Sequence, residues 1–187
     1  DSINGGIFPT TESDAEALVT GNAYSVFMNN GYDGMFNIAT GVLLVSDLMS
    51  DYGECTWRGW EPILYNRWTV GNGYNDNHWR WAKYMGKITM TIDRIENMDL
   101  SENVKSKYLA ELHCARGWLA FCMWDLYGPI PIADIETLKS PLEEQIVPRL
   151  SEEAMQDFIV TELTTAATVL PYNYTKESSD YGRFTKG

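Results

Sequence analysis

The side chains best suited to bind a ligand in this sequence are aromatic rings that cluster in its first half. Flat, rigid rings pack against the C–H faces of sugars, and they lose little side-chain entropy on binding. Asparagines follow the cluster, and their amides can form hydrogen bonds with sugar hydroxyls. The predicted ligand-contact residues are Trp57, Trp60, Tyr65, Trp68, Asn72 and Asn75. The alternative is that these rings fasten the stretch onto neighbouring helices.

Paired carboxylates are the second type of residue that could do chemistry. Cleavage of a glycosidic bond needs one acid of raised pKa and a partner carboxylate across a cleft. Asp47 and Asp51 are one helical turn apart, and we interpret them as helix ends exposed to solvent. His78 and His113 lack a histidine or cysteine four residues away, so they predict structural roles rather than a zinc site. We therefore expect no catalytic residue, no metal site and no cofactor.

Composition excludes two classes of partner. The formal net charge of −12 disfavours a nucleic-acid groove and electrostatic docking on anionic lipid. A hydrophobic fraction of 44% over 187 residues is that of one folded domain. No apolar run approaches the roughly 20 residues that span a bilayer. The three cysteines, Cys55, Cys114 and Cys122, are predicted to be free thiols.

The elements that must position these groups are helices. Apolar residues recur at steps of three and four, Ser101 and Ser151 are candidate N-caps, and Gly128 is a candidate helix end. Helices are expected at 14–29, 36–49, 77–98, 101–127 and 151–170, with a long ordered loop at 51–77 and an extended connection at 131–148. The predicted fold class is all-α, with irregular tetratricopeptide-like helical hairpins and long ordered loops.

Several motifs resemble those of the SusD-like (SusD/RagB) family of Bacteroidetes outer-membrane lipoproteins, which belong to starch-utilisation-type systems. The signature E-A-R-x-L-R-A-x-x-x-F-x-L-x-x-x-x-G-x-x-P is matched at Glu111, Arg116, Phe121, Leu126, Gly128 and Pro131. Later matches are Arg149 to Ser151, Ile159 to Pro171, and Gly182 to Gly187, and an earlier one is Asn22 to Tyr24. The chain departs from the signature at Leu112, His113, Gly117 and Asp125.

The resemblance implies that residues 1–187 are the N-terminal helical portion of a longer SusD-like domain. It implies a non-catalytic protein that binds glycans at the outer-membrane surface through a lipid anchor upstream of residue 1. The implied partner is a SusC-like TonB-dependent transporter, to which the nutrient is delivered. Two other functions stay open, a helical-repeat scaffold that binds protein and an all-α carbohydrate-active enzyme.

The charged pair in the family signature and four further tryptophans are expected to be structural. Glu111 and Arg116 predict buried ion pairs of the scaffold, since a buried charge needs a partner. The tryptophans expected in the core or at helix interfaces are Trp79, Trp81, Trp118 and Trp124.

Overall fold

The computed structural model describes residues 9–28, 34–37, 41–50, 52–67, 69, 78–140 and 145–187. It divides into two compact units. The larger unit consists of Asp1–Ala23 and Lys83–Gly187, and the smaller unit is Tyr24–Ala82. Each unit has its own arrangement of helices.

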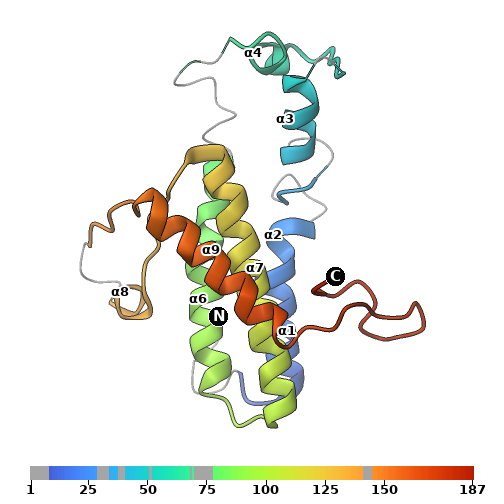
Figure 1. Ribbon diagram of the computed structural model, residues 1–187, viewed down its shortest axis with the longest axis vertical. Helices are drawn as coiled ribbons and strands as arrows, with labels where there is room; N and C mark the ends of the chain where they lie inside the picture. The colour runs from blue at the N-terminus through green and yellow to red at the C-terminus, as the bar shows by residue number, and fades with distance from the viewer. Residues whose placement is uncertain are drawn as a thin grey trace, which may run out of the picture. The chain divides into compact units, whose positions relative to one another are not determined.

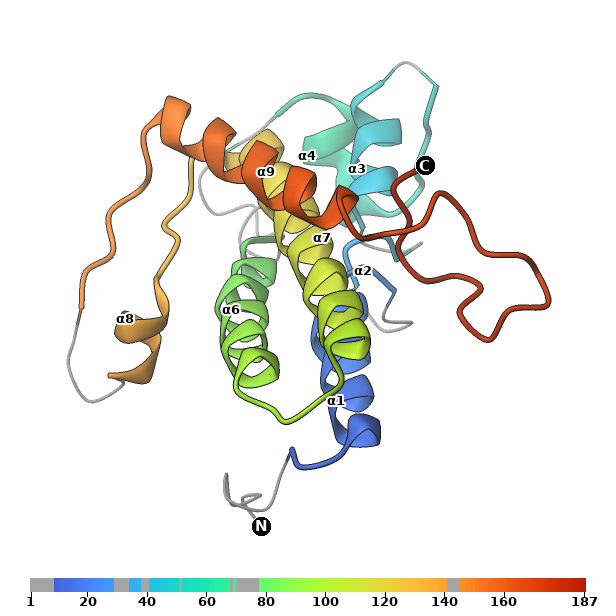
Figure 2. The ribbon, with the colours of Figure 1, turned by 60° about the horizontal axis from the view of Figure 1, so that its bottom comes forward.

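The larger unit is built around one long helix, α7 (Glu102–Tyr127), which packs against α1 (Glu12–Val19), α6 (Lys83–Glu96) and α9 (Glu152–Ala167). Helices α6 and α7 form an antiparallel hairpin, and α9 crosses α7 obliquely (Figures 1 and 2). Because α7 has neighbours on several sides, its apolar residues are not confined to one face. The short helix α8 (Ile135–Lys139) packs on α6.

Gly117 allows the close crossing of α7 and α9. A Cβ atom at this position would lie 2.9 Å from the Cβ of Glu162 and from the Cγ of Leu163. Only a residue without a side chain fits at such a distance, since ordinary carbon contacts begin near 3.5 Å. The departure from the family signature at Gly117 is therefore explained by helix packing.

Of the two serines predicted as N-caps, Ser151 caps its helix through its side chain, whereas Ser101 precedes α7 without a side-chain cap hydrogen bond. The Ser151 hydroxyl accepts a hydrogen bond from the Ala154 amide at 3.1 Å, which caps α9. Thr11 and Asp14 form a capping box at the start of α1. Gly128 ends α7 with a φ of 71°, a left-handed conformation that favours glycine.

A buried ion pair joins α7 to the C-terminal segment. The Arg183 guanidinium donates two hydrogen bonds to the fully buried carboxylate of Glu111, at 2.8 and 2.7 Å. It also donates to Glu16 of α1 at 2.6 Å, and Glu16 accepts from the Tyr108 hydroxyl at 2.8 Å. Three segments distant in the sequence are thus joined by one arginine. The prediction that Glu111 is paired within the scaffold is confirmed.

A second ion pair joins α7 to α9. Arg116 donates to both carboxylate oxygens of Glu162, at 2.6 and 2.7 Å, and to the Thr89 hydroxyl at 3.1 Å. His113 lies 3.1 Å from the same carboxylate, which confirms a structural role for this histidine. The structural role predicted for Arg116 is confirmed as well.

The Glu162 carboxylate should make the folded protein less stable in acid. Burial raises the pKa of this group, but the hydrogen bonds from His113 and Arg116 outweigh it and hold the pKa below its ordinary value. A lowered folded-state pKa stabilises the fold above the unfolded-state value, and that stability is lost as the pH falls through the folded-state pKa. We expect urea unfolding to show a falling free energy below about pH 4.3, the ordinary pKa of glutamate. The Glu162→Gln variant should show a shallower fall over the same range, whereas an equal slope would contradict this role for Glu162.

The smaller unit contains short helices and turns. They are α2 (Ser25–Met28), α3 (Val42–Met49), a 3₁₀ turn at Arg58–Trp60, α4 (Glu61–Leu64) and a 3₁₀ turn at Arg80–Ala82. Its hydrophobic cluster brings two residues of α3 against two of the segment that follows, namely Val45, Leu48, Trp60 and Ile63. Phe27 and Phe36 also stack, with ring centres 5.9 Å apart.

The predicted all-α class is confirmed, while several boundaries were wrong. The described residues contain no β-strand, only an isolated bridge between Pro131 and Arg149. The first predicted helix is interrupted by a π-helical turn at Thr20–Tyr24, and the second begins at Val42 rather than at residue 36. The predicted loop contains α4, and the predicted extended connection contains α8. A proline in the first turn favours α4, and the Asp134 side chain caps α8.

The structural tryptophans and the cysteines largely occupy the predicted environments. Trp81 is fully buried and stacks on His78, and Trp124 donates to Glu152 at the start of α9. Trp79 and Trp118 are more exposed than predicted, each at 36%. The three cysteines are free thiols, and burial raises the pKa of Cys114 and Cys122 to about 11.

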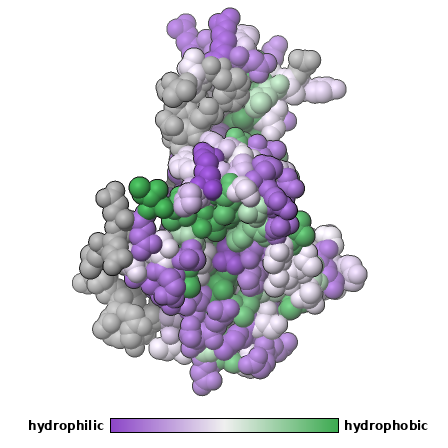
Figure 3. Space-filling view, turned by 60° about the vertical axis from the view of Figure 1, so that its left-hand side comes forward, coloured by the Kyte–Doolittle hydropathy of each residue, from purple (hydrophilic) through white to green (hydrophobic). Residues whose placement is uncertain are grey.

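Large apolar side chains of α7 and α9 reach the surface of the larger unit. They are Trp118, Phe121, Val160 and Leu163. On the face drawn in Figure 3, apolar side chains gather in a patch among hydrophilic ones. Within the described residues, no helix is both long enough and apolar enough to cross a membrane.

Candidate functional site

The segment 52–67 of the smaller unit, which we call the exposed-ring segment, presents three aromatic side chains to solvent. Trp57 is 62% exposed, Tyr65 is 57% exposed and Tyr52 is 98% exposed. Tyrosine and tryptophan rings of this size normally bury much of their area, so exposure makes them candidates for ligand contact. Exposure leaves Trp57 and Tyr65 accessible for the predicted ligand contact, which stays a prediction, and Tyr52 is accessible in the same segment.

The same segment is fastened by a buried ring. Trp60 is only 2% exposed and packs with Ile63 against Val45 and Leu48 of α3. The amide of Trp60 donates to the Trp57 carbonyl at 2.9 Å, which closes the 3₁₀ turn. Of two rings three residues apart, one is therefore in the core and one is in solvent. The prediction of Trp60 as a ligand contact was wrong, because its ring faces are covered by aliphatic side chains.

The end of α4 fixes polar groups beside Tyr65. Asn66 adopts a left-handed conformation with a φ of 51°, and its backbone N–H donates to the Ile63 carbonyl at 3.1 Å. The Arg67 amide then donates to the Pro62 carbonyl at 2.7 Å. This turn brings the Arg67 guanidinium over the Tyr65 ring, 5.3 Å from its centre. The Tyr65 ring, the exposed side-chain amide of Asn66 and the Arg67 guanidinium therefore come from three consecutive residues.

Three other predicted contacts lie outside the described residues. They are Trp68, Asn72 and Asn75. Their assignment to the site stays a prediction. Tyr52 was missed because its neighbours in the sequence give no sign of whether its ring is covered.

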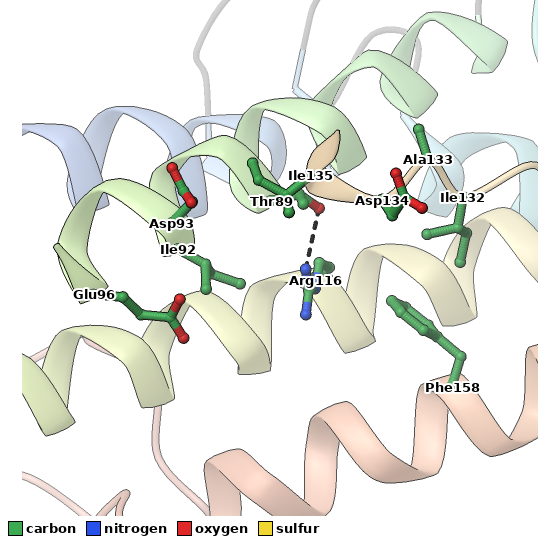
Figure 4. A pocket seen from close by; sticks show the side chains of 10 residues that line it. All are labelled: Thr89, Ile92, Asp93, Glu96, Arg116, Ile132, Ala133, Asp134, Ile135 and Phe158. Carbon is green, nitrogen blue, oxygen red and sulfur yellow. Dashed lines mark hydrogen bonds between the residues drawn. The ribbon is translucent and has the colours of Figure 1, made fainter. Parts of the chain in front are cut away.

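A pocket of about 360 Å³ in the larger unit brings carboxylates together (Figure 4). Its carboxylates are Asp93, Glu96 and Asp134, and its apolar lining includes Ile92 and Phe158. Asp93 is paired with Lys139 at 2.7 Å. The Asp134 side chain accepts from the Thr137 amide at 2.8 Å and caps α8, and this backbone hydrogen bond lowers the pKa of Asp134.

Two of the three carboxylates in that pocket, Asp93 and Asp134, are poorly suited to act as a catalytic acid. A glycosidic acid needs a raised pKa, whereas Asp134 is held as an anion and Asp93 is engaged by a lysine. Arg116, which also lines the pocket, is engaged by Glu162 and Thr89. Among the residues that the structure describes, no group of three His, Cys, Asp or Glu side chains could hold a metal ion.

Comparison with solved structures identifies the class of fold. A SusD-like carbohydrate-binding protein from Bacteroides fragilis matches this chain with a TM-score of 0.71 at 22% sequence identity. The match covers 95% of this chain and 35% of the Bacteroides fragilis protein. The fold of the chain is therefore SusD-like, and the resemblance drawn from the motifs is confirmed at the level of the fold.

Two further structures support the same fold. The surface glycan-binding protein A of Bacteroides fluxus matches with a TM-score of 0.74 at 21% identity, over 95% of this chain and 38% of its own. A structure solved with xylogluco-oligosaccharide matches with a TM-score of 0.65 at 19% identity, over 94% of this chain and 32% of its own. The chain thus spans about a third of the length of these proteins. Neither a protein-family model nor a curated protein matches the sequence.

Proposed function

We propose that the protein binds glycans without cleaving them, and that the exposed-ring segment supplies part of the contact surface. The observation that carries this proposal is the exposure of Trp57 and Tyr65 on a segment that is fastened by Trp60. Such a segment holds its rings in place before the ligand arrives, which reduces the entropy lost on binding. The SusD-like fold, shared with proteins described as carbohydrate-binding, supports the same proposal.

The polar groups next to Tyr65 suit hydroxyl-rich ligands. Arg67 can donate hydrogen bonds to sugar oxygens, and the exposed Asn66 amide can both donate and accept. Apolar contact by the rings together with amide and guanidinium hydrogen bonds is the combination that a sugar ring needs.

Binding to soluble polysaccharides tests this proposal. Affinity electrophoresis of the chain in gels that contain neutral or acidic polysaccharides should show retardation by at least one polymer. Release of reducing ends should stay at background in the same mixtures. Retardation by no polymer would contradict glycan binding, and release of reducing ends at an enzyme-like rate would contradict the absence of catalysis.

The proposal extends to the place and partner of the protein. Following the SusD-like resemblance, we place it at the outer-membrane surface, lipid-anchored upstream of residue 1, where it passes glycans to a SusC-like TonB-dependent transporter. In cells that express the natural protein, an affinity tag at its C-terminus should retain such a transporter from detergent-solubilised outer membranes. Recovery of the tagged protein without any TonB-dependent transporter would contradict the partnership.

A further inference from the structure

A second pocket in the larger unit, of about 450 Å³, has a different chemistry. Its walls come from α1 and the turn that follows, from one face of α6, and from α8. The lining residues are Leu18, Asn22, Lys83, Gly86, Lys87, Met90, Thr91, Arg94 and Leu138. The volume is within the range of about 300–1,000 Å³ typical of ligand pockets.

The pocket is positively charged in a protein whose net charge is −12. Lys83, Lys87 and Arg94 line it, and no carboxylate does. The salt bridges of the described residues involve none of these three cations. The Lys83 and Lys87 ammonium groups lie 5.4 and 4.8 Å from the centre of one ring, that of Tyr84. Two like charges held on the same ring create a local potential that attracts an anion.

Local backbone features build the opposite wall of this pocket. Asn22 lies in the π-helical turn Thr20–Tyr24, a distortion often found at functional sites. Its side-chain amide donates to the Thr91 hydroxyl at 2.9 Å, and that hydroxyl donates to the Lys87 carbonyl at 2.8 Å. Asn22 is therefore fixed beside the cations, with an amide oxygen that can accept from a ligand hydroxyl.

Gly86 lets α8 line one side of the pocket. A Cβ atom at Gly86 would lie 3.3 Å from Leu138 Cδ2, so the absence of a side chain allows Leu138 to approach α6. Leu138, Leu18 and Met90 then give the pocket an apolar part next to its cations. Such a pocket suits a ligand that has both a C–H surface and an anionic group.

We propose that this pocket binds acidic sugar residues of a glycan, with carboxylates at Lys83, Lys87 and Arg94. The proposal rests on the glycan-binding function proposed above, and it names the class of glycan. Ammonium and guanidinium groups form strong charge-assisted hydrogen bonds with carboxylates. Lys83 and Arg94 are eleven residues apart on α6, about 16.5 Å along the helix axis at 1.5 Å per residue, a spacing that suits an oligosaccharide rather than a single small anion.

Calorimetric titration with matched acidic and neutral ligands tests this proposal. The probes are trigalacturonic acid and a hyaluronan tetrasaccharide, each compared with its methyl ester at constant ionic strength. We expect at least one acid to bind at least tenfold more tightly than its ester. The Lys83→Gln/Lys87→Gln variant should lose at least tenfold in affinity for that acid. The control variant Lys176→Gln/Lys186→Gln removes the same charge outside the pocket and should bind as the wild type does.

The outcomes separate this inference from the proposed function. Equal affinity of acid and ester, or unchanged binding by the Lys83→Gln/Lys87→Gln variant, would overturn the inference. Failure of both acids to bind, while a neutral polysaccharide still retards the protein, would also overturn it and leave the proposed function intact. If no glycan bound, neutral or acidic, both the proposed function and this inference would be contradicted.

Discussion

Replacing Arg183 with methionine is expected to lower the free energy of unfolding by about 3–5 kcal/mol, the typical effect of removing one partner of a buried pair. The variant leaves the Glu111 carboxylate fully buried without the guanidinium that donates to both of its oxygens. It also removes the hydrogen bond from Arg183 to Glu16, so this contact between α1 and the C-terminal segment is lost. Urea unfolding followed by circular dichroism measures the change.

Two further variants show whether the effect comes from the buried charge. Lys176→Met removes an exposed cation from the same segment and should stay within about 0.5 kcal/mol of the wild type. Arg183→Met/Glu111→Gln removes the uncompensated charge and should recover part of the loss. Equal stability of Arg183→Met and Lys176→Met would contradict the role assigned to the Arg183–Glu111 pair.

Substitution of two tryptophans that are three residues apart should change the stability of the smaller unit by very different amounts. Trp60→Ala is expected to destabilise the smaller unit by about 3–5 kcal/mol, because it opens a cavity in the cluster of Val45, Leu48 and Ile63. Trp57→Ala removes a ring that is 62% exposed and should change stability by no more than about 0.5 kcal/mol.

Hydrogen exchange of the α3 amides, measured in both variants, separates these roles. Exchange in α3 should speed up strongly in Trp60→Ala and stay at the wild-type rate in Trp57→Ala. If the two variants exchanged alike, the division of the segment into a fastening ring and an exposed ring would be wrong.

The long helices could be predicted from the sequence because local signals agree there. Ser101, Ser151 and Gly128 mark ends of α7 and α9 within a residue of where they lie. The π-helical turn at Thr20–Tyr24 was missed, since it depends on packing rather than on a local motif. Helix α3 was predicted too early because its apolar run continues upstream of Gly41.

The candidate site was predictable only in part, because exposure in an irregular segment is decided by tertiary contacts. Trp57 and Trp60 are the same residue type in the same stretch, and only the position of α3 determines which one is buried. The partners of the buried charges also depend on tertiary contacts that the sequence does not reveal. Glu111 was expected to have a partner, but Arg183 lies 72 residues away and no local signal connects them.

The pocket lined by Lys83, Lys87 and Arg94 was also predictable only in part from the sequence. Two of its cations are four residues apart, so a shared helix face could be read from the sequence. Asn22 and Leu138 join them only through the fold, because each belongs to a different element of the larger unit.

Glycan binding through the exposed rings is tested most directly by affinity electrophoresis of Trp57→Ala/Tyr65→Ala beside the wild type. The control is Tyr181→Ala, which removes a tyrosine that is 59% exposed in the larger unit. In gels that contain the polysaccharide that retards the wild type most, the double variant should bind at least tenfold more weakly, equivalent to about 1.4 kcal/mol. Tyr181→Ala should be retarded as the wild type is. Undiminished retardation of the double variant would contradict the assignment of the binding surface to the exposed-ring segment.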